Sequence, residues 1–481
     1  MRTFASASRA SSLTTFPLLT LRAGPVGPRL TSAGQVHAIG RLAHGRRYPP
    51  AAPETELTWA SYAGAMRALL FGTEPEPVAE PDTDIRNLKM LAAAPMRVVD
   101  MDEPRLFGPD WVMTKPRLVG ICGSESKQAF FDYASFTSPE RSGSFRDNPM
   151  KNFVSFPHVM GHEVVADVIE IGPETEGLAV GDRVVLNPWL TCGPRGVATR
   201  CPACQAGDLS QCWSFGVGPI APGIHTGMCK DVPGGFGELM AAHDSMLFKV
   251  PDSVSDEQAV FADPFAVSLH GITRHPPQPG SKVLVYGAGA LGTSAIAILR
   301  AFYPTVDVMV VARFATQCAL AESLGALTVA PEPREELLET VAAWSGGVLQ
   351  PADGLPMAFP GGIDVVYDTI GAAETLEVGA RLLRARGTLV KLGMHGPARW
   401  EDTPVYFKEI TFTGSNAFGF EEVEGVRKHG IQHYLDLVES GRIDLTGMLT
   451  HTFRLEHWRD AFAALADQET SGAIKVAIDQ R

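Results

Sequence analysis

The sequence lacks any run of about 18 or more apolar residues, the length that a membrane-spanning helix requires. It also lacks an excess of positive charge. The formal net charge is −13, and a nucleic acid or an anionic membrane would repel such a chain. Cysteine is scarce. Seven cysteines, an odd number, without a secretory leader argue against a disulfide framework. The composition that remains, 45% hydrophobic and 20% charged, is typical of a soluble globular protein.

Lysine and acidic residues are both absent from residues 1–53, a segment that contains seven arginines and much Ser, Pro and Gly. This composition suits a transit peptide. The segment has no clear amphipathic period, however, so a disordered extension or a start codon assigned too far upstream explains it equally well. We predict that residues 1–65 lie outside the folded protein, and we expect a cytoplasmic location, or a mitochondrial one if the segment is a transit peptide.

The rest of the chain changes character along its length. From Met66 to about Val250, short β-like runs such as "HEVVADVIEIG" and "DRVVLNP" are broken by Gly and Pro, which predicts a mostly β domain. Apolar strand candidates such as "SKVLVY" and "GIDVVYDTIG" then alternate with helical segments such as "LGTSAIAILRAF". That alternation predicts βαβ units with a parallel sheet. Beyond about Gly414 we expect two helices and a final strand, "AIKVAID".

A glycine-rich loop opens the α/β region. In "KVLVYGAGALGTSAIAI", Gly287, Gly289 and Gly292 follow a strand and precede a helix, as in dinucleotide-binding loops. The next strand ends in Ala312 and Arg313, where an acidic residue would bind the ribose 2′-hydroxyl of NAD. A guanidinium there can pair with a 2′-phosphate, so the sequence favours NADP over NAD. The alternative is that Arg313 is a solvated loop residue.

Several residues have the chemistry of metal ligands. Cys122 lies in "GICGSE", and "GHE" supplies His162 and Glu163. An H-E-x-x-H protease site is excluded because Ala166 stands where the second histidine is required. Four further cysteines are crowded into "CGPRGVATRCPACQAGDLSQC", and such clusters in a reducing cell are usually metal sites: Cys192, Cys201, Cys204 and Cys212.

From Met66 to Arg481 the chain resembles the zinc-containing alcohol dehydrogenases of the medium-chain dehydrogenase/reductase superfamily. The resemblance rests on motifs that occur in family order: "GICGSE", "GHE", the cysteine cluster, "GGFGELM", "DPFAVSLH", "GAGALG" and "SGAIKVAI". It implies an α/β protein in which a GroES-like β-rich catalytic domain is interrupted by a Rossmann dinucleotide-binding domain. The implied division is residues 66–262 for the first part of the catalytic domain, 263–414 for the Rossmann domain, and 415–481 for the segment that returns to the catalytic domain.

The resemblance makes Cys122 and His162 catalytic zinc ligands, with Glu163 entering or supporting the shell. An open catalytic zinc site has three protein ligands, and the implied third is Asp263, where the polyol and threonine branches usually carry Glu. Asp263 before Pro264 also fits a helix N-cap. The resemblance also implies that Ser124 relays the substrate proton and that Glu125 supports the histidine ligand. Lys127 stands near where some members have a relay histidine, which leaves the outer end of the relay open.

The cysteine cluster resembles the structural-zinc lobe of the family, with two and then seven residues between its last three members. Eight residues separate Cys192 from Cys201, where the family usually has two, so "GPRGVATR" is an inserted loop. A zinc site made of four cysteines tolerates a long loop between two ligands; the alternatives are a metal-free or three-coordinate lobe. The stretch between Cys122 and His162 is also longer than usual. Its aromatic residues wall a substrate pocket or simply pack the loop: Phe130, Phe131, Tyr133 and Phe136.

Together these features predict an enzyme that transfers a hydride between an alcohol or polyol and NAD(P), with one catalytic and one structural zinc ion and with NADP favoured. The expected partners are a small-molecule alcohol or carbonyl substrate and further copies of the chain, as a dimer or tetramer, but neither nucleic acid nor a membrane. One alternative is an NADPH-dependent aldehyde or ketone reductase. A non-catalytic NADPH-binding protein is the other, although such a protein has no use for an open metal site.

Overall fold

A computed structural model describes residues 64–130, 153–352, 354–396 and 398–481. The predicted extension, residues 1–65, therefore lies outside the described residues except for its last two positions. The first strand, β1 (Ala65–Phe71), begins there and covers the "MRALLF" run, as expected.

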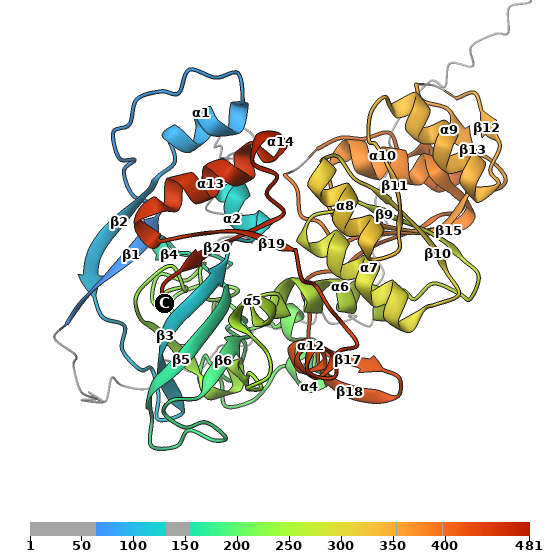
Figure 1. The fold of residues 1–481 in the computed structure, drawn as a ribbon. Helices are drawn as coiled ribbons and strands as arrows, with labels where there is room; N and C mark the ends of the chain where they lie inside the picture. The colour runs from blue at the N-terminus through green and yellow to red at the C-terminus, as the bar shows by residue number, and fades with distance from the viewer. Residues whose placement is uncertain (1–63, 131–152, 353, 397) are drawn as a thin grey trace, which may run out of the picture. The chain divides into compact units, whose positions relative to one another are not determined.

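The β-rich region is built on a seven-stranded sheet (Figure 1). Its strands run in the order β19-β20-β3-β5-β6-β8, and β7 pairs with β3 beside them. Their bounds are β3 (Trp111–Gly120), β5 (Glu163–Ile171), β6 (Arg183–Leu186), β7 (Met240–His243), β8 (Leu247–Lys249), β19 (Leu449–Phe453) and β20 (Lys475–Asp479). The C-terminal strand β20 pairs antiparallel with β3. The end of the chain therefore returns to the first region, as the family resemblance implies.

Pro116 lies inside β3, a strand that was not predicted from the sequence. Proline lacks an N–H, so within a sheet it is confined to edges and irregular positions. The β3–β5 pairing shifts register between Pro116 and Leu118, which accommodates it. A smaller sheet joins β1 to β2 (Met96–Asp102) and β4 (His158–Val159).

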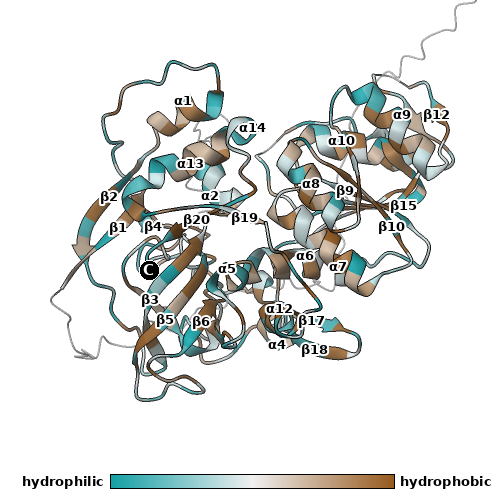
Figure 2. Cartoon of the chain, viewed as in Figure 1, coloured by the Kyte–Doolittle hydropathy of each residue, from teal (hydrophilic) through white to brown (hydrophobic). Residues whose placement is uncertain are grey.

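The second region contains a six-stranded parallel sheet in the order β11-β10-β9-β14-β15-β16. Helices lie on both faces of it (Figure 1), and burial on both faces explains why its strands are apolar runs (Figure 2). The strands are β9 (Lys282–Tyr286), β10 (Asp307–Val311), β11 (Leu327–Val329), β14 (Ile363–Asp368), β15 (Leu383–Lys391) and β16 (Thr411–Gly414). The helices are α7 (Ala290–Phe302), α8 (Ala315–Ser323), α9 (Arg334–Ser345) and α10 (Ala373–Leu382).

The remaining elements connect or cover these sheets. The longest is α6 (Ala262–Arg274), which packs against α7 and α12 (Gly430–Glu439). The other helices are α1 (Arg86–Ala92), α2 (Gly123–Ala129), α4 (Pro202–Ala206), α5 (Asp256–Ala259), α11 (Thr403–Phe407), α13 (Trp458–Ala466) and α14 (Gln468–Ser471). Two short strand pairs complete the fold, β12 (Leu349–Gln350) with β13 (Met357–Ala358) and β17 (Phe420–Val423) with β18 (Val426–His429).

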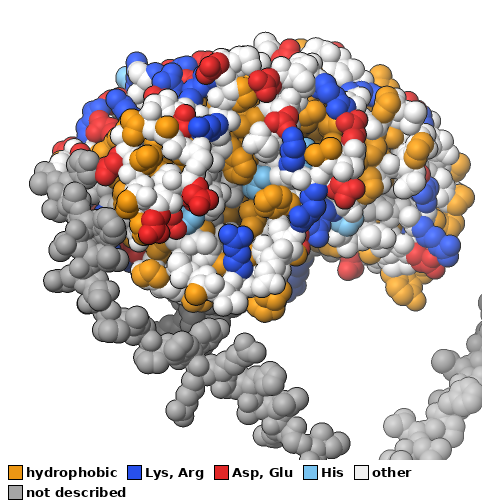
Figure 3. Space-filling view, turned by 90° about the horizontal axis from the view of Figure 1, so that it is seen from below, with side chains coloured by type: hydrophobic (Ala, Val, Ile, Leu, Met, Phe, Trp, Pro, Cys, Tyr) orange, Lys and Arg blue, Asp and Glu red, His pale blue; other side chains and the backbone are white. Residues whose placement is uncertain are grey.

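The observed sheets agree with the predicted fold class and with the order of its parts, while the boundaries at 262/263 and 414/415 stay predictions. Within the described residues, no helix is long and apolar enough to cross a membrane. On the face drawn in Figure 3, acidic and basic side chains are interspersed rather than gathered into a large patch of one sign.

Candidate functional site

Three side chains with metal-binding chemistry meet where β3 ends and β5 begins. Cys122 follows β3, and His162 and Glu163 stand at the start of β5. The antiparallel pairing sets Gly120 opposite Glu163, so the two ends come together. One ligand atom from each of the three residues lies within 4.8 Å of the others. A thiolate, an imidazole and a carboxylate at this spacing fit a zinc ion.

Glu125 fixes the geometry of this group. Its Oε1 accepts hydrogen bonds from His162 Nδ1 (2.9 Å) and from the backbone N–H of Gly161 (2.8 Å), and its Oε2 accepts one from the N–H of Cys122 (2.8 Å). Because Nδ1 of His162 donates to Glu125, its Nε2 is the nitrogen that could coordinate a metal. Burial raises the pKa of Glu125, but the charge and hydrogen bond of His162 outweigh burial and hold that pKa below its usual value. The contact between Glu125 and His162 that the resemblance implies is present, while the role of His162 as a zinc ligand stays a prediction.

Lys475 is a buried neighbour of these residues that was not predicted from the sequence. It forms an ion pair with Glu163, and its Nζ donates a hydrogen bond to the carbonyl of Ile121 (3.0 Å). Burial lowers the pKa of Lys475, whereas Glu163 and Cys122 raise it, and the net direction is upward. The signal was a lysine within the otherwise apolar run "AIKVAI", at the point where β20 begins. The carboxylate of Glu163 thus already has a cationic partner.

Asp263 is the second residue of α6, and the N-cap is Phe261 without a side-chain cap bond. The structure therefore gives no support to the helix-cap alternative. Within the described residues, Asp263 forms no hydrogen bond or ion pair, although it is only 7% exposed. Burial raises its pKa to about 7, and the charges of His162 and Glu163 act on it in opposite directions. A buried carboxylate without a protein partner is available to a cation.

The residues predicted for proton relay lie on α2. Ser124 is half-buried in the first turn, two residues after Cys122. Lys127 Nζ donates to the backbone carbonyl of Met394. Phe130 is buried, whereas three aromatic residues predicted to wall the pocket lie outside the described residues: Phe131, Tyr133 and Phe136.

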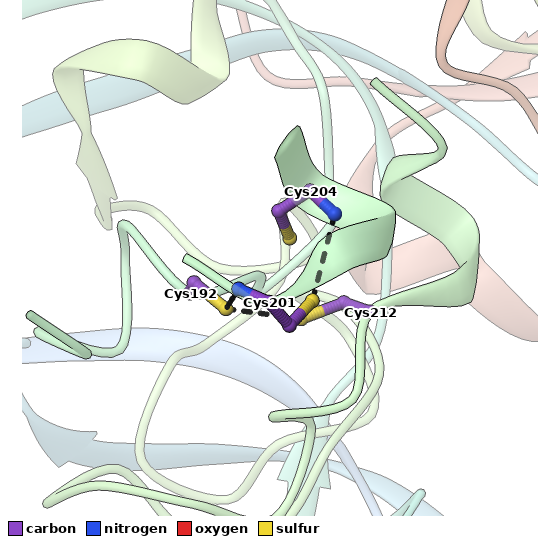
Figure 4. A group of neighbouring side chains, drawn as sticks. All are labelled: Cys192, Cys201, Cys204 and Cys212. Carbon is purple, nitrogen blue, oxygen red and sulfur yellow. Dashed lines mark hydrogen bonds between the residues drawn. The ribbon is translucent and has the colours of Figure 1, made fainter. Parts of the chain in front are cut away.

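The four clustered cysteines form a second candidate metal site, with sulfur atoms that face a common centre (Figure 4). Cys192 Sγ lies 3.7 Å from Cys212 Sγ, which in turn lies 4.0 Å from Cys201 Sγ. Disulfide sulfurs are about 2.05 Å apart, so these distances exclude disulfides. Bonds of about 2.3 Å to one tetrahedral zinc would place sulfurs about 3.8 Å apart, which agrees with the observed spacing.

Backbone N–H groups surround these sulfur atoms. Cys201 Sγ lies 3.5 Å from the N–H groups of Cys204 and Trp213, and Cys212 Sγ lies 3.3 Å from that of Ser214. Such donors favour the thiolate form that binds metal. A hydrogen bond from Cys212 lowers the pKa of Cys204. The chemistry of the four donors fits a zinc ion.

The predicted dinucleotide loop has the geometry that its glycines suggested. Gly287 has φ +99°, and a Cβ atom at Gly292 would stand 1.9 Å from the carbonyl oxygen of Gly287. By contrast, a Cβ atom at Gly289, the N-cap of α7, would meet nothing within 4 Å. This open position at a helix N-terminus fits a pyrophosphate. Arg313, just after β10, is exposed, and its guanidinium lies 5.4 Å from the ring centre of Phe314.

Comparisons with known proteins agree with this geometry. The family description "Alcohol dehydrogenase GroES-like domain" matches residues 108–252, and "Zinc-binding dehydrogenase" matches residues 290–430. A probable diacetyl reductase [(R)-acetoin forming] from Saccharomyces cerevisiae is 27% identical over 79% of this chain and 86% of its own. Sorbitol dehydrogenase from Bacillus subtilis is 25% identical over 73% of this chain and 85% of its own.

Solved structures share the fold. A 2R,3R-butanediol dehydrogenase from Bacillus subtilis aligns with a TM-score of 0.62 at 22% identity, covering 86% of this chain and 100% of its own. A zinc-binding dehydrogenase from Sinorhizobium meliloti, bound to NADP, aligns with a TM-score of 0.61 at 24% identity, covering 86% and 99%. With its two family domains in order, the chain belongs to the zinc-type alcohol dehydrogenases of the medium-chain dehydrogenase/reductase superfamily, which transfer a hydride between an alcohol or polyol and NAD(P).

Proposed function

We propose that this enzyme oxidises a secondary hydroxyl of a diol or polyol, or reduces the corresponding ketone, with NADP as the preferred cofactor. The observation that carries the proposal is the meeting of Cys122, His162 and Glu163 within 4.8 Å. The names of the relatives from yeast and Bacillus subtilis support the substrate class. Arg313 supports the cofactor preference, because its exposed guanidinium forms no ion pair within the described residues.

We assign the catalytic metal to Cys122, His162 and Asp263. The group within 4.8 Å includes Glu163 and not Asp263. Asp263 is nevertheless preferred as the ligand, because the carboxylate of Glu163 is paired with Lys475, whereas that of Asp263 has no hydrogen bond or ion pair in the described part of the chain. Bound zinc polarises the oxygen of an alcohol or carbonyl group. Glu125 keeps His162 in the coordinating tautomer, and Ser124 takes the proton from the substrate hydroxyl.

We assign a structural zinc to Cys192, Cys201, Cys204 and Cys212. All seven cysteines lie in the described part of the chain as free thiols, which fits a reducing compartment. We therefore propose the cytoplasm, with the mitochondrion as the alternative that N-terminal sequencing of the mature protein would reveal. A homo-oligomer is also proposed, and light scattering of the purified enzyme tests it.

Asp263→Asn tests the ligand assignment, because the amide is close in shape but carries no charge. We expect the variant to stay folded, to lose one zinc per chain under mild chelation, and to lose most turnover. Asp256→Asn is a matched control. Asp256 is also a buried aspartate in the first turn of a helix, but it is paired with Arg117 and Arg183, so its loss should lower stability and spare the zinc. Two retained zincs and normal turnover in Asp263→Asn would transfer the role to Glu163.

The substrate class needs a separate test. A panel of monoalcohols, vicinal diols, polyols and the corresponding ketones, assayed with NADP(H) and NAD(H), should show the highest kcat/KM for a substrate with neighbouring oxygens. Preference for simple aldehydes with NADPH would favour the reductase alternative. Cofactor binding without turnover of any panel member would favour a non-catalytic role.

A further inference from the structure

Arg195 lies in the loop inserted between Cys192 and Cys201, and its side chain is fully buried. Its Nε donates a hydrogen bond to the carbonyl of Leu190 (2.9 Å). The two terminal nitrogens donate to four more carbonyls, those of Val217 (3.2 Å), Ile220 (2.9 Å), Ala221 (3.0 Å) and Gly223 (2.7 Å). All these acceptors are neutral. Within the described residues, no carboxylate forms an ion pair with Arg195.

A buried guanidinium needs an anion nearby. Arginine stays protonated in proteins, and an uncompensated buried charge costs several kcal/mol. Carbonyl acceptors satisfy its N–H groups but supply no negative charge. Asp231 is in the neighbourhood, but its carboxylate pairs with Lys230 (2.9 Å) and accepts a hydrogen bond from the N–H of Ala221 (2.7 Å).

The cysteine site, once it holds zinc, has an excess of negative charge. Four thiolates around one divalent zinc ion carry a formal charge of −2, and three of the four cysteines are buried: Cys192, Cys204 and Cys212. Arg195 is joined to the site at both ends. The turn that holds it is closed by the N–H of Val197 on the carbonyl of Cys192 (2.9 Å). Its guanidinium binds Val217, whose N–H donates to Ser214, and the hydroxyl of Ser214 lies 3.2 Å from Cys192 Sγ.

We propose that Arg195 is the built-in counterion of the cysteine site, a positioning residue whose buried charge offsets the zinc tetrathiolate and thereby slows zinc loss. The proposal rests on the structural zinc assigned above. Burial lowers the pKa of Arg195, and the groups that oppose this effect are Cys229, Cys212 of the cysteine site, and Asp231. The inserted loop thus has a role, since it carries the cation to the metal site.

The test measures zinc release from the purified full-length enzyme to a chelating dye at fixed pH and salt. Arg195→Met removes the charge and keeps most of the side-chain volume, and we expect zinc release to be about tenfold faster or more, as for other groups that support metal ligands. Arg200→Met is the matched control. Arg200 is an exposed arginine in the same insertion, and its loss should leave the release rate unchanged.

A purely structural role for Arg195, as a clamp on five carbonyls, makes a different prediction. A clamp would stabilise the zinc-loaded and zinc-stripped proteins equally, whereas a counterion matters mainly when the thiolates are charged. We therefore expect Arg195→Met to lower Tm more in the loaded protein than in the stripped one. An equal Tm loss in both states, or unchanged release, overturns the proposal.

Arg195→Lys keeps the proposal testable if Arg195→Met fails to fold. Lysine retains the charge but cannot reproduce all five hydrogen bonds, so release should stay within a few-fold of native although Tm falls. Tenfold faster release from Arg195→Lys overturns the counterion role. Metal analysis of the native enzyme distinguishes failure of the counterion role of Arg195 from failure of the structural-zinc assignment. Two zincs per chain with unaffected variants would overturn the role of Arg195 alone. A single zinc that Cys204→Ser still retains would overturn the structural-zinc assignment as well.

Discussion

Replacing Gly289 by alanine is expected to weaken NADPH binding without destabilising the protein. The new methyl group would meet no atom of the chain within 4 Å, and the backbone φ of −77° is comfortable for alanine. The methyl group would, however, fill the space in which the pyrophosphate approaches the N-terminus of α7. Losing one charge-assisted hydrogen bond costs roughly 1.5–3 kcal/mol, which raises Kd by about ten- to a hundredfold.

Gly292→Ala provides the contrast. Its Cβ atom would stand 1.9 Å from the carbonyl oxygen of Gly287, whereas real Cβ contacts are essentially never shorter than 3.0 Å. The loop must therefore move by roughly 1 Å, and overpacking of this kind costs about 1–3 kcal/mol of stability.

Fluorescence titration with NADPH and thermal unfolding of both variants measure these effects. The expected pattern is a raised Kd with native Tm for Gly289→Ala, and a lowered Tm for Gly292→Ala. Native NADPH affinity in Gly289→Ala would refute the placement of the pyrophosphate at this loop.

Three further predictions concern charge and metal. Arg313→Gln should weaken NADP binding about ten- to a hundredfold and leave NAD nearly unaffected, as measured by titration with both cofactors; equal affinity of the native enzyme for both would contradict it. Cys204→Ser should lower Tm or disrupt assembly while the folded fraction keeps near-normal turnover, and a folded but inactive variant would move the cluster to the active centre. Burial raises the pKa of Glu421, but its hydrogen bonds from His270 (2.5 Å) and Thr273 (2.8 Å) hold that pKa below its usual value. The stabilisation from the charged Glu421 is present above about pH 4.3 and is lost as the pH falls further. The Tm of Glu421→Gln should therefore fall less steeply in acid than the Tm of the native enzyme. Parallel Tm curves for the two proteins would contradict the reasoning.

Much of the fold could be predicted because its signals are local. The apolar runs of β9, β10 and β14 and the periodic segment of α7 identified a parallel sheet with covering helices. The strand β3 was not predicted because a proline such as Pro116 is unusual inside a strand. The register shift in the β3–β5 pairing accommodates this proline.

Some parts of the candidate sites could likewise be predicted from the sequence, and others could not. Residue spacing by itself suggested the dinucleotide loop and the pair Cys201 and Cys204, because their partners are a few residues away and backbone geometry fixes their separation. The sequence also identified His162 and its support by Glu125, through the family resemblance.

Only the tertiary structure decided the roles that depend on partners far along the chain. Lys475 reaches Glu163 because β20 pairs with β3, which pairs with β5. Arg195 could be read as an ordinary loop arginine until its burial and its five carbonyl partners were known. Sequence periodicity reports which face of an element is buried, but not which other element covers it. Long-range packing decides which element covers that face. The role of a buried charge can be assigned only when the groups around it are known.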